Sequence, residues 1–171
     1  MPAVSRECAP IVADKPDGDM LNVVVRTIRD LDPSDDFFPL RAAAASEELE
    51  IVLTDPAALQ LAADHVREAA EKVHADSVLG ASQVGNRLAA AAVARGGTLR
   101  MFAEATPGGH VLLVDSVLVT GYQLRLAEKL VRRYGATAVS ACVLADASGG
   151  ESVVESLDSF VILAVSDLPA H

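Results

Sequence analysis

The chain has little of what several classes of protein need. Its 171 residues include no Trp, and aromatic residues make up only 4%, although hydrophobic residues make up 51%. No hydrophobic run approaches the roughly 20 residues that span a bilayer, so we expect no membrane contact. The first 19 residues lack the basic and apolar segments of a secretory signal peptide. This composition is typical of one compact domain with a large core of small aliphatic side chains.

Basic residues and cysteines are also scarce. The chain has 14 Lys and Arg against 24 Asp and Glu, a formal net charge of −10. Because nucleic-acid binding requires clustered basic residues, we expect no nucleic-acid partner. Only Cys8 and Cys142 are present, which favours reduced thiols and a cytoplasmic protein over a disulfide scaffold. The four His residues show no spacing with Cys or carboxylates that indicates a metal site, so we predict none.

Hydrophobic spacing divides the chain into three parts. Residues 1–18, interrupted by Pro and Asp, are predicted to be disordered. Residues 19–54 are predicted to hold a helix, ended by Asp32-Pro33, and a short strand over residues 49–53. Residues 55–171 are predicted to form an α/β core, which together with residues 19–54 makes a single domain. This core opens with a helix that runs to about His74, and Thr54-Asp55-Pro56 supplies a capping residue and a Pro at its start.

Beyond residue 75 the pattern alternates between short apolar runs and amphipathic segments. Strands are expected over residues 77–79, 98–103, 111–114, 138–144 and 160–165, with helices over 87–95 and 121–134. Alternation of this kind, with strands that are apolar on both faces, predicts an α/β fold with a doubly wound parallel sheet. Ligands of such sheets bind beyond the carboxyl ends of the strands. Asp115, Asp146 and a loop over residues 80–85 are expected to lie there.

The segment HVLLVDSVLVTGYQL, residues 110–124, is the most informative stretch. A buried strand ends at Asp115, a polar turn follows, and a helix begins near Gly121. A strand, a tight turn and a helix N-terminus form the geometry that holds phosphate groups, because the first helical N–H groups have no intrahelical partner.

This segment resembles the ribose-phosphate loop of the type I phosphoribosyltransferases, where apolar residues and two acids precede a Thr-Thr-Gly loop. TDPAALQLAADHVREAA, DSVLGASQVGNRLAAAAVA and CVLADASGGE resemble further segments of that family, in the same order. The likeness is closest to the orotate phosphoribosyltransferases. It implies a phosphoribosyltransferase-like fold with a small N-terminal hood, formed by residues 19–54, and a homodimer. It implies Mg²⁺ only if a ligand of the phosphoribosyl pyrophosphate type binds.

The resemblance also assigns candidate site residues. It implies ribose and phosphate binding by Asp115, Ser116, Thr120, Gly121, Tyr122 and Gln123. It implies a pyrophosphate loop and cleft formed by Ser82, Gln83, Val84, Gly85 and Arg100. Several positions depart from the family pattern: Ser116 replaces the second acid, Val84 replaces a Lys or small polar residue, and Ala147 replaces a base-contacting Arg. Both lysines that normally follow the position of Arg100 are missing, and no catalytic residue is assigned.

These departures lead to three functional hypotheses. A charge-assisted hydrogen bond contributes about 1.5–3 kcal/mol, so losing four or five such contacts argues against ordinary orotate transfer. Our first hypothesis is a degraded active site that binds a ribose-phosphate or nucleotide-like ligand, or a partner subunit such as an active paralogue. The second is an active transferase with altered base or sugar-phosphate specificity. The third is an interaction domain whose cleft is filled by Tyr122 and Met101.

Individual residues keep alternatives of their own. Asp115 either holds ribose hydroxyls or caps the following turn. Ser82 and Asn86 either line a ligand loop or cap a helix. Arg100 either faces the cleft or pairs with Glu104. The helix over 121–134 is expected to bury Leu124, Ala127, Leu130, Val131 and Tyr134. Its basic residues are expected to face solvent, as is His65 of the helix that runs to about His74; these basic residues are Arg125, Lys129, Arg132 and Arg133.

Overall fold

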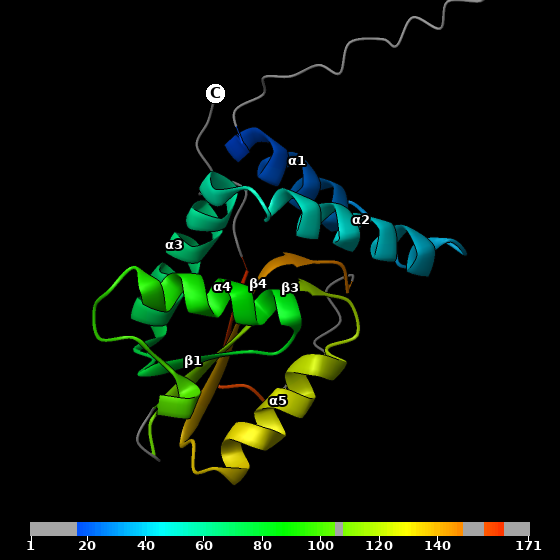
Figure 1. The fold of residues 1–171 in the computed structure, drawn as a ribbon. Helices are drawn as coiled ribbons and strands as arrows, with labels where there is room; N and C mark the ends of the chain where they lie inside the picture. The colour runs from blue at the N-terminus through cyan, green and yellow to red at the C-terminus, as the bar shows by residue number, and fades with distance from the viewer. Residues whose placement is uncertain (1–16, 105–107, 149–155, 163–171) are drawn as a thin grey trace, which may run out of the picture.

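The computed structural model describes residues 17–104, 108–148 and 156–162. Its centre is a five-stranded sheet with the order β2-β1-β3-β4-β5, in which all neighbouring strands are parallel (Figure 1). The strands are β1 (Ser77–Gly80), β2 (Arg100–Met101), β3 (His110–Leu118), β4 (Ala138–Asp146) and β5 (Ser159–Ile162). The helices are α1 (Asp17–Arg29), α2 (Phe38–Val52), α3 (Pro56–Val73), α4 (Gln83–Ala94), α5 (Tyr122–Arg133) and the 3-10 helix η1 (Phe102–Glu104). The predicted α/β parallel sheet is confirmed, with β3 as its middle strand.

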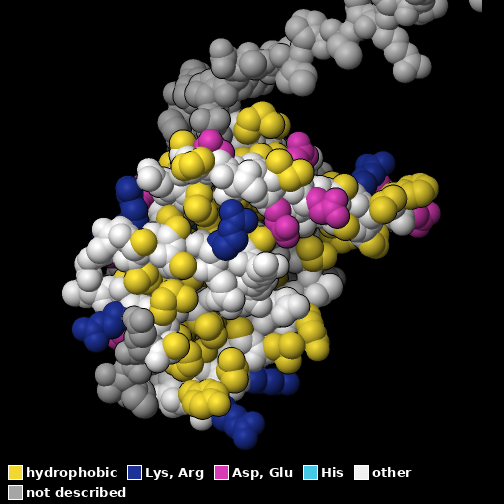
Figure 2. All heavy atoms as spheres, in the orientation of Figure 1, with side chains coloured by type: hydrophobic (Ala, Val, Ile, Leu, Met, Phe, Trp, Pro, Cys, Tyr) yellow, Lys and Arg dark blue, Asp and Glu magenta, His cyan; other side chains and the backbone are white. Residues whose placement is uncertain are grey.

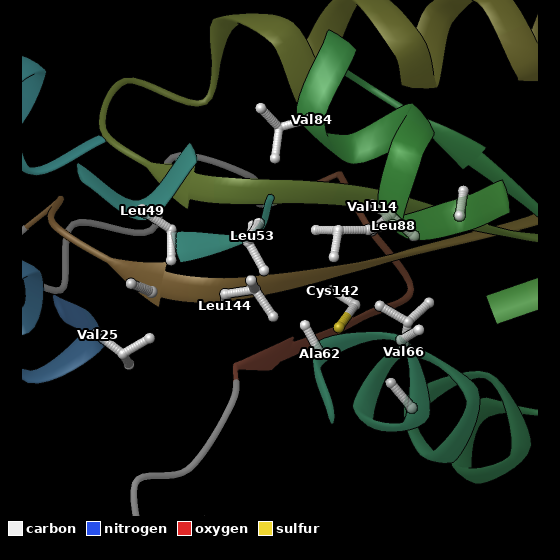
Figure 3. Packing of buried hydrophobic residues seen from close by; sticks show 14 of the residues in the cluster. Val25, Leu49, Leu53, Ala62, Val66, Val84, Leu88, Val114, Cys142 and Leu144 are labelled. Atoms are coloured by element: carbon white, nitrogen blue, oxygen red, sulfur yellow. The ribbon is translucent and has the colours of Figure 1, made fainter. Parts of the chain in front are cut away.

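Alternate side chains of β3 enter two hydrophobic clusters on the two sides of the sheet. Leu112 and Val114 belong to the larger cluster, which also contains buried residues of α1, α2, α3 and α4 (Figure 3). Val111 and Leu113 belong to the smaller cluster with the buried residues of α5. Helices therefore cover both faces, so the strands carry no polar face, as the sequence predicted.

The start of α3 follows the predicted capping pattern. The Asp55 carboxylate accepts hydrogen bonds from the backbone N–H groups of Ala57 and Ala58 at 2.8 and 2.9 Å, and Pro56 occupies the first helical position. Proline costs nothing there because its missing N–H has no intrahelical acceptor. His74 ends the helix in a left-handed conformation, with φ 57°.

The strand predicted over residues 49–53 is wrong. These residues lie at the end of α2 and in its cap, so the N-terminal hood consists of two helices, α1 and α2. Ala42, Ala45 and Leu49 are buried at helical spacing, and Leu53 is buried just beyond the helix. A five-residue segment with four apolar residues does not distinguish a strand from the buried end of a helix, and here the contacts between α1 and α2 favour the helix.

Several predicted boundaries also need correction. The loop expected over residues 80–85 is short, because α4 begins at Gln83 rather than near Arg87. The strand expected over 98–103 is reduced to β2, followed by η1. β3 and β4 continue beyond their expected ends, to Leu118 and Asp146. The segment predicted to be disordered, residues 1–18, ends inside α1, which contains residues 17 and 18. Residues 1–16 of that segment lie outside the described residues, as do residues 163–165 of the last predicted strand.

Two expectations about exposure are wrong. Leu130 and Tyr134 were expected inside but are 47% and 64% exposed, whereas Glu128 of the same helix is buried. The Arg132 guanidinium lies 2.9 Å from the Glu128 carboxylate, which explains how the charge is accommodated. His65 was expected to face solvent but is buried in α3. No helix in the described part of the chain is long and apolar enough to cross a membrane.

Candidate functional site

Asp115 of β3 is the polar residue around which the candidate site is built. Its side chain is 8% exposed. The Ser82 hydroxyl donates a hydrogen bond to Asp115 Oδ1 at 2.6 Å, and the backbone N–H of Ser116 donates to the same oxygen at 2.8 Å. Within the described ranges, no group donates to the second oxygen, Oδ2. The carboxylate is therefore oriented through one oxygen, which leaves the other for a ligand.

Ser82 connects Asp115 to the N-terminus of α4. Its Oγ accepts a hydrogen bond from the Gly85 N–H at 3.0 Å, so it is the N-cap of that helix. The same hydroxyl therefore satisfies a helix donor and holds the carboxylate. The predicted alternatives for Ser82, a ligand loop or a helix cap, are resolved in favour of the cap, although the cap contacts the candidate site.

Gly85 allows α4 to approach β3 very closely. A Cβ atom at this position would lie 2.1 Å from the Val114 carbonyl oxygen, a distance that real side chains do not adopt. The Ala81 N–H donates to the same Val114 oxygen at 2.8 Å. The connection from β1 to α4 is thus fixed against the backbone of β3, and Ser82 has a defined position beside Asp115.

Burial raises the pKa of the Asp115 carboxyl above its ordinary value, because desolvation disfavours the charged form. The hydrogen bonds from Ser82 and Ser116 stabilise the carboxylate and lower the pKa in part. A desolvated carboxylate gains more than an exposed one from hydroxyl donors of a ligand, because its interactions are screened less by water.

The turn that resembles a phosphate loop lies beyond the end of β3. Since β3 pairs with β4 as far as Leu118, the strand continues three residues past Asp115, or about 10 Å at ordinary strand rise. Gly121 then adopts φ 69°, a left-handed conformation that favours glycine, and α5 begins without a side-chain cap. Thr120 Oγ1 accepts a 3.3 Å hydrogen bond from the Tyr122 N–H.

Arg125 is the residue of this turn that sequence reasoning missed. Its guanidinium donates to the Thr120 carbonyl oxygen at 3.0 Å, so it reaches back over the first turn of α5. The sequence placed Arg125 among the basic residues of a solvated face. The available signal was its position four residues after Gly121, because a residue one helical turn along has a side chain that can reach the start of the helix. A positive charge and a helix N-terminus therefore occur together at this turn.

The other predicted site residues lie in different surroundings. Val84 and Gly85 are buried in the helix–sheet contact, whereas Gln83, Tyr122 and Gln123 are exposed. Tyr122 is 58% exposed and therefore does not fill a closed cleft, which is contrary to the expectation of the third hypothesis.

Arg100 does not lie near Asp115 in the sheet. Arg100 of β2 pairs with Ser77 of β1, and Ser77 pairs with Val111 of β3. Arg100 is therefore level with Val111, but β1 lies between its strand and β3. Asp115 lies four residues further along β3, or about 13 Å at ordinary strand rise. The prediction that Arg100 faces the ligand cleft receives no support from this register.

No metal centre is visible among the described residues, which contain no group of three or more His, Cys, Asp or Glu side chains able to hold an ion. Asp146, the other acid at this edge, accepts hydrogen bonds from the N–H and hydroxyl of Ser148 at 2.8 and 2.6 Å. A single carboxylate, Asp115, does not make a magnesium site, so the residues that the structure describes do not form one.

Solved structures share this arrangement of strands and helices. The orotate phosphoribosyltransferase of Mycobacterium tuberculosis H37Rv, in complex with Fe(III) dicitrate, superposes with a TM-score of 0.56 over 91% of this chain and 100% of that one, at 21% identity. The chain has the phosphoribosyltransferase fold. This confirms the resemblance at the level of the fold. At that identity the likeness does not establish an activity.

An adenine enzyme of the same fold has the same TM-score and identity over a smaller share of this chain. The Giardia lamblia enzyme, complexed with 9-deazaadenine, has a TM-score of 0.56 at 21% identity, and the match covers 67% of this chain and 83% of that one.

A second structure of the M. tuberculosis orotate enzyme, in complex with 5-phospho-alpha-D-ribosyl 1-diphosphate, has a TM-score of 0.53 at 19% identity over 91% of this chain and 98% of that one.

The curated relatives match only part of the chain. Adenine phosphoribosyltransferases from two Bradyrhizobium strains are 43% identical over 54 residues, which is 30% of this chain and 30% of each relative. The chain therefore aligns with less than a third of the length of these relatives. No protein-family model matches the sequence. Because adenine and orotate enzymes are both similar, the expected preference for the orotate enzymes is not supported.

Proposed function

We propose that this chain binds a ribose-phosphate or nucleotide-like ligand at the carboxyl edge of its sheet and does not carry out ordinary orotate transfer. Asp115 Oδ2 accepts hydrogen bonds from ribose hydroxyls, and the turn at Thr120 and Gly121 receives the phosphate. The observation that carries the proposal is the 2.6 Å bond from Ser82, which holds a buried carboxylate by one oxygen and leaves the other available.

The phosphate end of the proposed site rests on α5. The N–H of Tyr122 donates to Thr120 Oγ1, but the N-cap residue Gly121 has no side chain to cap the next N–H groups, those of Gln123 and Leu124, which are available to an anion. The Arg125 guanidinium at the Thr120 carbonyl adds positive charge beside the turn. Asp115 and this turn are separated by the last three residues of β3, so the proposed ligand carries its hydroxyls and its phosphate at opposite ends.

The proposal that orotate transfer is lost rests on the missing cations. Catalysis of pyrophosphate displacement depends on groups that stabilise the developing charge of the leaving group. Val84 is an apolar, buried residue at the start of α4, and Arg100 lies at the other end of the sheet from Asp115. Neither is placed to hold a pyrophosphate group beside Asp115.

A second candidate, an active transferase for another base, is favoured by one observation. One 54-residue segment, 30% of the chain, is 43% identical to adenine phosphoribosyltransferases. In this candidate function the ligand site is the same, and only the turnover differs. Adenine is the base to test first.

Calorimetric titration tests binding, and product formation tests turnover. The ligands are ribose 5-phosphate, nucleoside monophosphates and phosphoribosyl pyrophosphate, each with and without Mg²⁺. We expect ribose 5-phosphate or a monophosphate to bind, and Asp115→Asn to weaken binding about tenfold or more, because a charged acceptor is lost. Asp64→Asn is the matched control, since Asp64 pairs with Arg95 at the far end of α4; its affinity should equal that of the wild type.

The outcomes distinguish the hypotheses. Release of pyrophosphate with adenine or orotate would establish the transferase and refute the loss of activity. Absence of binding by every phosphate ligand would refute the ribose-phosphate site and favour the interaction domain. A second copy of the chain, an active paralogue as partner and a cytoplasmic location stay predictions.

A further inference from the structure

A cavity of about 360 Å³ lies at the amino edge of the sheet, where α3 ends and the loop from α4 leads into β2. Its volume is within the range of small-molecule sites, about 300–1,000 Å³. Ala75 and Leu99, which line the cavity, come just before β1 and β2. Asp115 lies towards the opposite edge, four residues beyond Val111, the partner of Ser77. The cavity is therefore separate from the proposed ribose-phosphate site.

Arg67 of α3 brings a positive charge to this cavity. Its side chain is 28% exposed and reaches the loop before β2, because Arg67 Nη2 would lie 3.4 Å from a Cβ atom at Gly97. The carboxylate of Glu71, which is 75% exposed, approaches Nη2 only to 4.0 Å. The guanidinium forms no hydrogen bond with a described residue, although it carries five N–H donors. A guanidinium that is largely covered in this way requires an acceptor from outside the described chain.

His74 and Thr98 add hydrogen-bonding side chains to the same cavity. In the described part of the chain, His74 is the one non-glycine residue with a positive φ. Glycine is the usual residue where a helix ends in this conformation, so the histidine keeps an imidazole at the cavity at a cost to the backbone. The last carbonyl oxygens of α3 accept hydrogen bonds from the N–H groups of His74 and Ala75, which reduces their repulsion of an anion.

Apolar side chains complete the cavity. Ala70, Ala75 and Leu99 line it beside the polar groups, and this combination suits a small molecule with one charged end. The chain's net charge of −10 does not exclude an anion here. Figure 2 shows that acidic side chains of the visible face gather over α2, which contributes no residue to the cavity. Charges separated by more than about 8 Å are largely screened at physiological ionic strength.

We propose that this cavity binds a small organic acid with one carboxylate and an apolar body. The carboxylate pairs with the Arg67 guanidinium, whose planar fork matches it, and accepts hydrogen bonds from His74 and Thr98. The apolar body lies against Leu99. A monoanion is favoured over a phosphate monoester, because Glu71 lies 4.0 Å from the guanidinium and repels a second negative charge. The proposal uses no property of Asp115 and holds or fails independently of ligand binding there.

Titration with benzoate, followed through backbone amide resonances, tests the proposal. We expect saturable shifts at Gly97, Thr98 and Leu99, no shift at Ser116, and a Kd of about 1 mM or tighter. Benzamide, which has the same shape without the charge, should bind about tenfold more weakly or worse. Phenyl phosphate should also bind more weakly than benzoate.

Substitutions then identify the contacts. Arg67→Gln should weaken benzoate binding about tenfold or more. Arg95→Gln is the matched control, because Arg95 pairs with Asp64 and does not line the cavity; its affinity should equal that of the wild type. His74→Gly removes the imidazole but relieves the left-handed backbone, so it should weaken binding without lowering Tm. Glu71→Gln should strengthen binding, because it removes a negative charge beside the guanidinium.

The outcomes are distinct. Absence of saturable shifts in the wild type, equal binding of benzamide, or equal affinities of Arg67→Gln and Arg95→Gln, both confirmed as folded by circular dichroism, would overturn the proposal. Tighter binding of phenyl phosphate than of benzoate would overturn the assignment of a carboxylate. Unchanged benzoate affinity of Asp115→Asn would support a separate site, whatever the result with ribose 5-phosphate.

Discussion

Replacing Ser82 by Ala tests how Asp115 is held. The variant loses the N-cap of α4, which costs about 0.5–2 kcal/mol, and a hydrogen bond to a buried carboxylate, which costs about 1.5–3 kcal/mol. We expect the free energy of unfolding to fall by about 2–5 kcal/mol, or roughly 4–20 °C in Tm for a chain of this size. Urea unfolding at pH 7, followed by circular dichroism, measures the change.

A double-mutant cycle separates the two contributions. In an Asp115→Ala background, Ser82→Ala should cost only the cap, about 1 kcal/mol. The matched control is Ser34→Ala, because Ser34 donates to Asp32 Oδ1 at 2.7 Å in the same Ser-to-Asp manner, but both residues are exposed. This control should change stability far less. Equal costs of Ser82→Ala in the two backgrounds, within 0.5 kcal/mol, would refute the coupling between Ser82 and Asp115.

Three further predictions concern the same region and the core. Because the folded state holds the Asp115 proton more tightly than the unfolded state, the free energy of unfolding should fall as pH rises from the ordinary pKa of 3.8 through the raised pKa. Urea unfolding at pH 3 to 8 measures this fall, which Asp115→Asn should lack. If the free energies of the wild type and of Asp115→Asn changed with pH in parallel, the result would count against the raised pKa. Gly85→Ala should destabilise the fold by about 1–3 kcal/mol or more, because the added Cβ meets the Val114 carbonyl. Gly96→Ala is the control, since position 96 has free space and only a positive φ, and it should cost about 1 kcal/mol. Thermal melts of both variants measure the difference. Burial raises the pKa of the Cys142 thiol to about 12, so a thiol reagent at pH 8 should label Cys142 only on unfolding; labelling of the native protein there, read by peptide mass spectrometry, would contradict its burial.

The core elements could be predicted from the sequence because their signals are local and redundant. The Thr-Asp-Pro start of α3 combines a cap with a proline, and both features specify the same boundary. Val111 to Val114 read as a strand buried on both faces, and β3 is the middle strand of the sheet.

The errors fall where tertiary contacts decide the outcome. The apolar run over residues 49–53 fitted a strand or a helix end, and packing of α2 on α1 selected the helix. Leu130 and Tyr134 of the α5 region belonged to a plausible inward stripe, but the buried residues of α5 are Leu124, Ala127, Glu128 and Val131, and the exposed Arg132 pairs with Glu128.

The candidate site was predicted in part. Ser82 and Asp115 were both named from the resemblance, but their 2.6 Å contact joins residues 33 positions apart and depends on the close approach at Gly85. Arg125 was assigned to solvent, because charge spacing along α5 does not reveal that its guanidinium folds back onto Thr120.

The most direct test of the account follows backbone amide resonances during a titration with ribose 5-phosphate. We predict that chemical-shift changes concentrate at Gly85 and Ser116, around Asp115, and at Tyr122 and Gln123, at the start of α5. The same titration of Asp115→Asn should need a higher ligand concentration for equal shifts. Shifts that cluster at the amino ends of the strands, or saturation of both proteins at the same concentration, would contradict a ribose-phosphate site centred on Asp115.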